Sequence, residues 1–170
     1  MQGAHVIIQT PYVICNDYMY GVLEHISEKT DTKVILNAVE KGSNPWGCTD
    51  YLNQKQKILD TGVTVYELMN EHAVHTKAVL IDDDISIVGS YNLDIRSTYL
   101  DTELMLVIES PELNEQIRAI EAAYMEKSKE VQPDGQETAG SLYKEKTLDK
   151  KKQIFYSVLR ILVRPFRQLL

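Results

Sequence analysis

The sequence predicts an α/β fold in which helices cover both faces of a mainly parallel or mixed sheet, with an amphipathic helix added at the C-terminus. Short apolar runs alternate with helix-forming segments over residues 5–68, an order that right-handed crossovers convert into parallel strands. The 170 residues are 44% hydrophobic and 25% charged. This composition suits one globular domain with a real core and a short appendage.

Strands and helices alternate through the N-terminal part. The expected segments are, in order, a strand at 5–9, a helix at 16–29, a strand at 33–39, a helix at 49–59 and a strand at 63–68. Asn16 or Asp17 can cap the first helix, and Thr49 or Asp50 the second, because short polar side chains accept hydrogen bonds from free backbone N–H groups. Gly62 marks the end of the second helix. The glycine-containing segment before that helix is expected to be a loop.

The middle of the chain predicts a hairpin, a strand and a helix. Apolar runs at 73–81 and 85–89 flank the acidic turn 82–84, and a further strand is expected at 102–108. Pro111, followed by acidic residues, opens a helix that runs to about Lys127.

Residues 128–149 are polar and aperiodic and contain one proline and two glycines, which predicts a flexible linker. The chain therefore divides into a domain at 1–127, this linker, and a basic amphipathic helix at 150–170. The helical spacing of the last segment comes from Ile154, Phe155, Val158, Leu159 and Leu162. Such a helix suits an anionic membrane surface. It equally suits docking on the body or on a second subunit, because amphipathicity alone does not distinguish lipid from protein.

Charge is distributed unevenly along the chain. The formal charge is −7, and the residues from Lys150 onward include six basic side chains and no acidic ones, so residues 1–149 carry −13. An acidic body makes nucleic acid an unexpected partner, since phosphate backbones are bound by clustered Lys and Arg. The basic end favours an anionic surface or partner.

The N-terminus as given lacks the charged region and apolar stretch of a signal peptide, and no segment approaches the roughly 20 apolar residues of a spanning helix. Cys15 and Cys48 are isolated thiols that define neither a metal site nor a disulfide framework. Together with the basic end, these features lead us to expect peripheral attachment at the cytoplasmic side of a membrane.

Four polar side chains are expected to converge on one pocket. His75 and Lys77 alternate along one strand, as do Ser90 and Asn92 where the next one ends, so each pair points to a single side. An imidazole, an ammonium, a hydroxyl and an amide together suit a phosphodiester, which needs a nucleophile, a cation and neutral donors. This arrangement requires no metal and no cofactor.

A nucleophilic imidazole must be held in one tautomer, which a carboxylate on its other nitrogen can do. Glu103, on the following strand, is the best candidate, and Asp101 is the reserve.

The spacing His-x-Lys-x4-Asp-x6-Gly-Ser-x-Asn, from His75 to Asn92, resembles the histidine–lysine–aspartate motif of the phospholipase D superfamily. Two further stretches are similar to the second half of bacterial cardiolipin synthases: Thr10-Pro11-Tyr12, and the run 92–97 followed by Glu103. The resemblance covers roughly residues 5–125 and leaves the tail unaccounted for.

The resemblance implies a catalytic half-domain at 1–127 and a role for each motif residue. His75 would become a transient phosphohistidine, and Lys77, Ser90 and Asn92 would hold the phosphate. Glu103 would orient His75. Asp82 would be a structural or electrostatic support within the catalytic set. The implied activity is phosphatidyl transfer or phospholipase cleavage of an anionic glycerophospholipid, similar to that of a cardiolipin synthase.

Enzymes of this superfamily use two such motifs, one histidine attacking while the other protonates the leaving alcohol, as general acid–base logic also demands. The other histidines are His5, His25 and His72, and none begins a His-x-Lys pair. The second half would come from a symmetric homodimer or from a missing N-terminal domain, and truncation is the favoured explanation.

Two other functions stay open. A nuclease of the same superfamily is disfavoured by the −13 body, and a non-catalytic remnant would keep the fold without a partner half. Other polar or aromatic features have simpler interpretations. We expect His72 to be a surface histidine, and residues 82–84 to be turn carboxylates rather than a cation site. Trp46 and Tyr91 could contact a ligand, but packing is at least an equally good explanation for each of them.

Overall fold

The computed structural model describes residues 4–169 and contains one eight-stranded mixed sheet, in the order β10-β9-β4-β3-β1-β5-β6-β8. The central strands β1 (His5–Gln9), β3 (Asp31–Asn37) and β4 (Thr64–Leu68) are parallel, and all other neighbours in this sheet are antiparallel. The predicted α/β fold is confirmed, but its parallel part is limited to these three strands.

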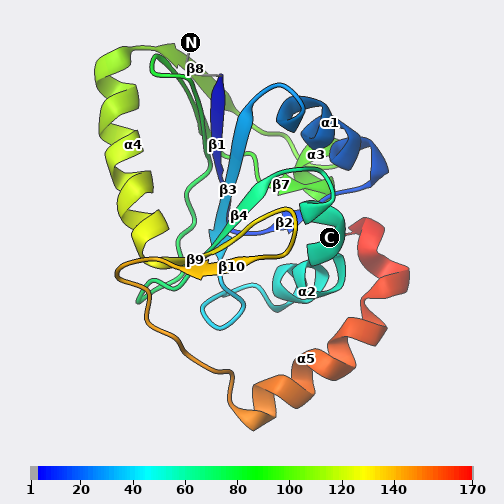
Figure 1. Ribbon diagram of the computed structural model, residues 1–170. Helices are drawn as coiled ribbons and strands as arrows, with labels where there is room; N and C mark the ends of the chain where they lie inside the picture. The colour runs from blue at the N-terminus through cyan, green and yellow to red at the C-terminus, as the bar shows by residue number, and fades with distance from the viewer. Residues whose placement is uncertain (1–3, 170) are drawn as a thin grey trace.

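Helices cover both faces of the sheet (Figure 1). On one face lie α1 (Asp17–Ser27) and α2 (Pro45–Leu59), and on the other lies α4 (Pro111–Glu126). Alternate residues of the same strands supply the two cores: Val34 and Leu36 face α1 and α2, whereas Ile35 faces the α4 side. This period of two is the pattern that a strand buried on both faces requires.

The start of α2 differs from the sequence prediction. The helix begins at Pro45 and not near Thr49, because the side chain of Asn44 accepts hydrogen bonds from the backbone N–H groups of Trp46 and Gly47. Proline suits a first helical position, where its missing N–H costs nothing. Residues 45–47, the end of the loop expected at 42–47, therefore form the first turn of the helix, and residues 42–44 precede it.

The expected hairpin consists of β5 (Ala78–Ile81) and β6 (Ile85–Gly89), which pair antiparallel. The first strand is shorter than expected, because residues 73–77 lie before β5 and are not part of it. A short pair of parallel strands, β2 (Val13–Ile14) and β7 (Leu93–Asp94), lies outside the main sheet.

The helix α3 (Ile95–Tyr99) was not predicted; the side chain of Asp94 caps it by accepting the N–H of Ser97 at 2.5 Å. The last strand of the predicted domain is β8 (Met105–Glu109), at the edge of the sheet.

The structure differs from the prediction of a flexible linker at 128–149. Residues 128–139 form β9 (Ser128–Val131) and β10 (Glu137–Ala139), which extend the main sheet beyond β4. Lys129 bridges Glu67 of β4 and Glu137 of β10, both at 3.1 Å. Because ion pairs hold this edge together, its sequence lacks the apolar alternation by which strands are recognised.

The C-terminal segment forms α5 (Lys150–Leu162) and the 3₁₀ helix η1 (Arg164–Leu169), and α5 packs against α2. Tyr156, Leu159 and Val163 are the buried residues of this contact. Within the part of the chain that the structure describes, no helix has the length and apolarity needed to cross a membrane.

Candidate active site

The polar cluster predicted from the sequence lies where β1 and β6 end and β5 begins. Gln9 pairs with Ala78, and Ala78 pairs with Val88, so the segments entering β5 and leaving β6 run side by side. The N–H of Gly89 donates to the carbonyl of Lys77 at 3.3 Å. His75 and Lys77 thus lie on the segment adjacent to Ser90 and Asn92.

Gly89 permits the close approach that brings β8 into this cluster. A Cβ atom on Gly89 would lie 2.0 Å from the carbonyl oxygen of Leu104, a distance at which the backbone would have to move. With glycine present, the N–H of Ser90 donates to that carbonyl at 3.0 Å. The segment bearing Glu103, which precedes β8 and was expected to belong to a strand at 102–108, is therefore held directly beside the motif.

His75 and Lys77 form a contacting pair. The ammonium Nζ of Lys77 lies 2.5 Å from Nδ1 of the imidazole and donates to the carbonyl of His75 at 2.8 Å. Burial, and then the charge of Lys77, lower the pKa of His75. Burial also lowers the pKa of Lys77, while Glu103 and Asp94 raise it. The imidazole is accordingly neutral near pH 7, and a neutral imidazole retains the lone pair that a nucleophile needs.

Glu103 belongs to a hydrogen-bond network with two serines. The hydroxyl of Ser90 donates to one carboxylate oxygen, and the hydroxyl of Ser97 donates to the other at 2.7 Å. These two hydrogen bonds lower the pKa of Glu103, and Lys77 adds a smaller lowering. The carboxylate is thereby kept ionised and fixes the direction of the Ser90 hydroxyl.

Asn92 lies at the end of the same network. Its amide Nδ2 donates to the hydroxyl of Ser97 at 3.3 Å. Its Oδ1 atom is buried and has no hydrogen-bond partner within residues 4–169. A buried polar atom without a partner carries a desolvation cost. Because Oδ1 can only accept, the capacity that this amide keeps for an anionic ligand is the second hydrogen on Nδ2.

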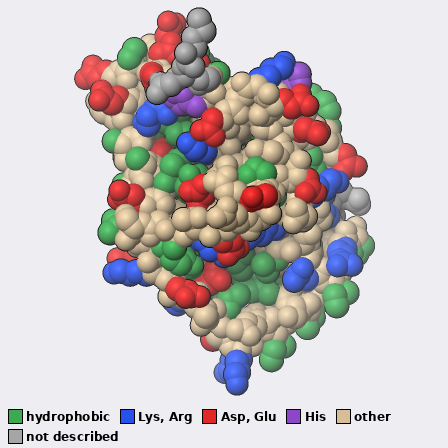
Figure 2. All heavy atoms as spheres, viewed as in Figure 1, with side chains coloured by type: hydrophobic (Ala, Val, Ile, Leu, Met, Phe, Trp, Pro, Cys, Tyr) green, Lys and Arg blue, Asp and Glu red, His purple; other side chains and the backbone are tan. Residues whose placement is uncertain are grey.

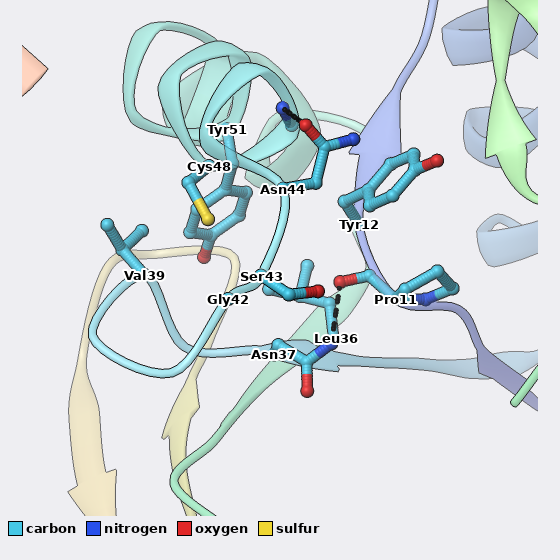
Figure 3. Close-up of a pocket in the computed structure, with 11 residues that line it drawn as sticks. Pro11, Tyr12, Leu36, Asn37, Val39, Gly42, Ser43, Asn44, Cys48 and Tyr51 are labelled. Carbon is cyan, nitrogen blue, oxygen red and sulfur yellow. Dashed lines mark hydrogen bonds between the residues drawn. The ribbon is translucent and has the colours of Figure 1, made fainter. Parts of the chain in front are cut away.

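Asn37 positions the segment that leads to His75, a role the sequence did not reveal. Its amide donates to the carbonyls of Pro11 at 3.1 Å and Val74 at 2.8 Å, and its Oδ1 accepts the N–H of Val74 at 2.8 Å. Figure 3 shows Asn37 beside Pro11 at the rim of a small crevice between residues 11–12, the end of β3 and α2. The only signal in the sequence was a polar residue at the end of an apolar strand.

Two of the predicted residues have different surroundings from those expected. Asp82 lies in the turn at the far end of β5, with φ of 47°, where its carboxylate accepts the backbone N–H of His5 at 3.0 Å. The whole of β5 separates it from Lys77, so its role here is to hold the turn. Glu103 has Ser90 and Ser97 as its hydrogen-bond partners, and His75 is not among them.

The remaining candidates also have defined surroundings. Asp101, the reserve carboxylate, pairs with Arg96 at 3.0 Å. The hydroxyl of Tyr91 lies 2.8 Å from that of Thr98, which gives it a structural contact. Both His72 and Trp46 are exposed.

The cluster opens directly to the surface. His75 and Ser90 are exposed, while Lys77 is only 9% exposed and forms the floor. Beside them, the edge strand β8 and the residue before it present apolar side chains to solvent: Leu104, just before the strand, is 72% exposed, and Leu106 and Val107 are 57% and 70% exposed. An open edge strand with an apolar surface is typical of a site that another chain or segment covers.

Chemically, this arrangement can accept a tetrahedral anion. The ammonium of Lys77 and the amide N–H₂ of Asn92 are donors for phosphoryl oxygens, and the imidazole of His75 lies beside them. The single hydroxyl proton of Ser90 is donated to Glu103 in this arrangement. Among the described residues, no group of three or more His, Cys, Asp or Glu side chains is placed to hold a metal ion.

Comparison with known families and proteins gives a consistent result. The family model described as "Cardiolipin synthase, PLD-like domain" matches residues 3–123. Cardiolipin synthase A of Wigglesworthia glossinidia brevipalpis is 27% identical over 126 residues, which cover 73% of this chain and 25% of that protein. Cardiolipin synthase A of Klebsiella pneumoniae is 28% identical over 130 residues, covering 74% and 25%. The chain thus spans about a quarter of the length of these relatives.

Two solved structures share the fold. Phosphatidylserine synthase of Haemophilus influenzae Rd KW20 superposes with a TM-score of 0.64 at 14% identity, covering 98% of this chain and 42% of that one. Nuc, a phospholipase D family member from Salmonella typhimurium, superposes with a TM-score of 0.62 at 16% identity, covering 75% and 82%. At such identities the likeness establishes the fold alone.

Proposed function

Because the chain belongs to the family of phospholipase D-like domains of cardiolipin synthases, we propose that it carries one catalytic half of an enzyme that transfers phosphatidyl groups through a phosphohistidine on His75. The observation that carries this proposal is the imidazole of His75 in contact with the Lys77 ammonium, with the amide of Asn92 held by Ser97 on the adjacent segment. A nucleophile, a cation and a fixed donor are the groups that phosphoryl transfer requires.

The reaction has two displacements. In the first, a nitrogen lone pair of His75 attacks phosphorus, the bond from phosphorus to the leaving alcohol breaks, and the alcohol oxygen takes both electrons and a proton from a general acid. In the second, an acceptor alcohol or water attacks the phosphohistidine, loses its proton to a base and releases the imidazole. A glycerophospholipid acceptor gives a synthase, and water gives a phospholipase.

Each polar neighbour has a role in this proposal. Lys77 faces the non-bridging oxygens, and its position on the floor of the site keeps its charge poorly screened. The second amide hydrogen of Asn92 donates to a remaining oxygen, whereas the hydroxyl proton of Ser90 is held by Glu103. Glu103 acts through Ser90 and Ser97, whose hydroxyls it orients.

A second half is required to complete the site. The first displacement needs a general acid, and none of the other histidines in residues 4–169 lies beside His75 in a position to be one. His72 is an exposed loop residue, and His25 lies in α1. His5 lies beside the distant turn, with its Nε2 3.3 Å from Asp83. A nucleophilic His75 also needs a carboxylate on its Nδ1 atom, where Lys77 now lies. Groups from across an interface would supply both functions.

The exposed apolar strand β8 is the surface that we assign to this second half. It lies at the sheet edge next to Ser90, and its side chains Leu106 and Val107 are 57% and 70% exposed. Apolar side chains on an open sheet edge favour contact with another chain or segment. The partner is a second copy of this chain, related by a twofold axis, or the other half of a longer polypeptide. The quarter-length coverage of the curated relatives supports the second source.

The proposed substrate is an anionic glycerophospholipid in a bilayer, which the protein reaches as a peripheral protein at the cytoplasmic leaflet. The basic segment 150–170 supports this placement, because that leaflet carries negative charge. The charge of −13 on the rest of the chain disfavours a nucleic-acid substrate.

The proposal is tested by measuring transfer of labelled phosphatidyl groups from phosphatidylglycerol, together with the oligomeric state by light scattering. His75→Ala should abolish transfer, and the neighbouring His72→Ala is the matched control that should retain it. An active dimer would identify a second copy as the other half, whereas an inactive, folded monomer would assign that half to another segment. Full transfer by His75→Ala would refute the role of His75.

A further inference from the structure

The helix α5 carries apolar side chains on two sides. Tyr156, Leu159 and Val163 are at most 8% exposed and pack on the body. A second group lies in solvent: Ile154 (66% exposed), Phe155 (50%), Val158 (53%), Ile161 (69%) and Leu162 (58%). At 100° per residue, the second group spans an arc of about 120°, and the centre of that arc lies roughly 130° around the helix from the centre of the first group. We call this second group the outer face of α5.

Docking on the body does not explain the outer face. The inner residues already bury the helix against α2, and polar bonds fix its orientation. Arg160 donates to the side chain of Asn53 at 2.9 Å and to the carbonyl of Leu52 at 3.1 Å, and Asn53 donates back to the carbonyl of Arg160 at 3.0 Å. The outer face is therefore held in a fixed orientation on the surface.

Positive charge accompanies the outer face. From Lys150 to the C-terminus there are six basic residues and no acidic ones, on a chain whose other residues carry −13. Lys150, Lys151, Lys152 and Arg164 are exposed. Figure 2 shows hydrophobic and basic side chains together along the lower right edge, where Figure 1 places α5. Phe166, 60% exposed, continues the apolar surface into η1.

This combination favours a lipid surface over a second copy of the chain. A symmetric pair formed through α5 would place the basic residues of both copies on one interface, with no acidic residue of this segment to offset them, since a twofold interface uses the same patch of each copy. An anionic bilayer instead offers phosphates to the lysines and acyl chains to the apolar arc.

We infer that the outer face of α5 lies in the interface of an anionic phospholipid bilayer. Ile154, Phe155, Val158, Ile161 and Leu162 then enter the boundary between head groups and acyl chains, and the exposed basic residues contact lipid phosphates. Because α5 is fixed to α2, binding would also fix the orientation of the whole domain on the membrane. The inference names the lipid-binding surface for the proposed function but requires no catalysis.

The test measures binding of the full chain to sedimenting vesicles of phosphatidylglycerol mixed with phosphatidylcholine, and to vesicles of phosphatidylcholine alone. His75→Ala is the background, so no turnover occurs. We expect binding to the anionic vesicles that weakens with salt. Val158→Glu/Ile161→Glu should weaken it about tenfold or more, since it places two carboxylates in the apolar arc. Ile120→Glu, an exposed position on α4 (53%), is the matched control and should bind normally.

Thermal unfolding of all variants checks that the exposed substitutions leave the fold intact. Unchanged vesicle binding by Val158→Glu/Ile161→Glu would overturn the inference, and equal binding to neutral vesicles would overturn the anionic specificity. A dimer that dissociates in this variant, with no vesicle binding by the parent, would identify the outer face as a protein interface. Vesicle binding together with full transfer by His75→Ala would count against the catalytic proposal alone.

Discussion

Arg167→Ala should be the most destabilising single change in the C-terminal segment. Arg167 reaches the buried carboxylate of Asp50, with Nε 2.6 Å from Oδ1 and Nη2 3.1 Å from Oδ2. It also donates to the carbonyl of Cys15 and to the hydroxyl of Tyr20. Asp50 has no solvent exposure, so removal of the guanidinium leaves a buried charge without its partner.

The expected loss is about 3–5 kcal/mol in the free energy of unfolding, the cost typical of breaking one side of a buried ion pair. For a chain of this size, that loss lowers Tm by roughly 10 °C. Arg167→Lys keeps the charge but loses the planar fork, so its loss should be smaller. Asp50→Asn, added to Arg167→Ala, should recover part of the stability because no buried charge remains.

The deficit should also depend on pH. Burial raises the pKa of Asp50, and Arg167 opposes that rise. Without Arg167 the folded-state pKa stands further above the unfolded one, which destabilises the fold at every pH above the unfolded pKa. The deficit is thus largest near neutral pH and shrinks as the pH falls toward 4.

Urea unfolding followed by circular dichroism measures these differences. A loss below about 1 kcal/mol for Arg167→Ala, the value of an ordinary exposed pair, would refute the docked position of the C-terminal segment.

Three further changes test other parts of the structure. Glu121 is 1% exposed, and burial raises its pKa to about 7. The difference in unfolding free energy between Glu121→Gln and the parent, measured by urea unfolding, should therefore shift in favour of the variant by about 3 kcal/mol between pH 4.5 and 7. A difference independent of pH would contradict the buried position. Asn37→Ala removes three hydrogen bonds that hold the segment before His75 and should slow phosphatidyl transfer about tenfold with the fold retained; an unchanged rate would show that this segment needs no such support. Glu103→Gln weakens the hydrogen bonds from Ser90 and Ser97 and should slow phosphatidyl transfer roughly 10- to 100-fold. Glu103→Asp is the control that preserves the charge. Equal rates for both variants and the parent would exclude a role for the carboxylate.

The sequence predicted the parts of the fold in which apolar spacing determines structure. Strands such as β1 and β3 are apolar because both of their faces are buried, and the hairpin around residues 82–84 follows from its turn carboxylates. In contrast, β9 is held by Lys129 between two glutamates, and tertiary charge pairing leaves no local periodicity. The earlier start of α2 depended on the side chain of Asn44, whose capping geometry the sequence does not reveal.

For the site, the motif placed His75, Lys77, Ser90 and Asn92 on adjacent strand ends, as their spacing predicts. It could not supply the long-range contacts. The partners of Glu103 depend on how closely β8 approaches at Gly89, and the support from Asn37 joins residues 37 positions apart. Such contacts follow from the assembled sheet and not from local patterns.

The central claim is that His75 becomes covalently phosphatidylated. The most direct test is to quench the protein, or its assembled two-half form, during turnover of phosphatidylglycerol and to locate the adduct by mass spectrometry at neutral to alkaline pH. The tryptic peptide that ends at Lys77 contains both His72 and His75, so fragmentation must separate them. The account predicts an acid-labile phosphatidyl group on His75 that is absent from His75→Ala. An adduct on His72, or turnover in the assembled form that proceeds in His75→Ala, would contradict it.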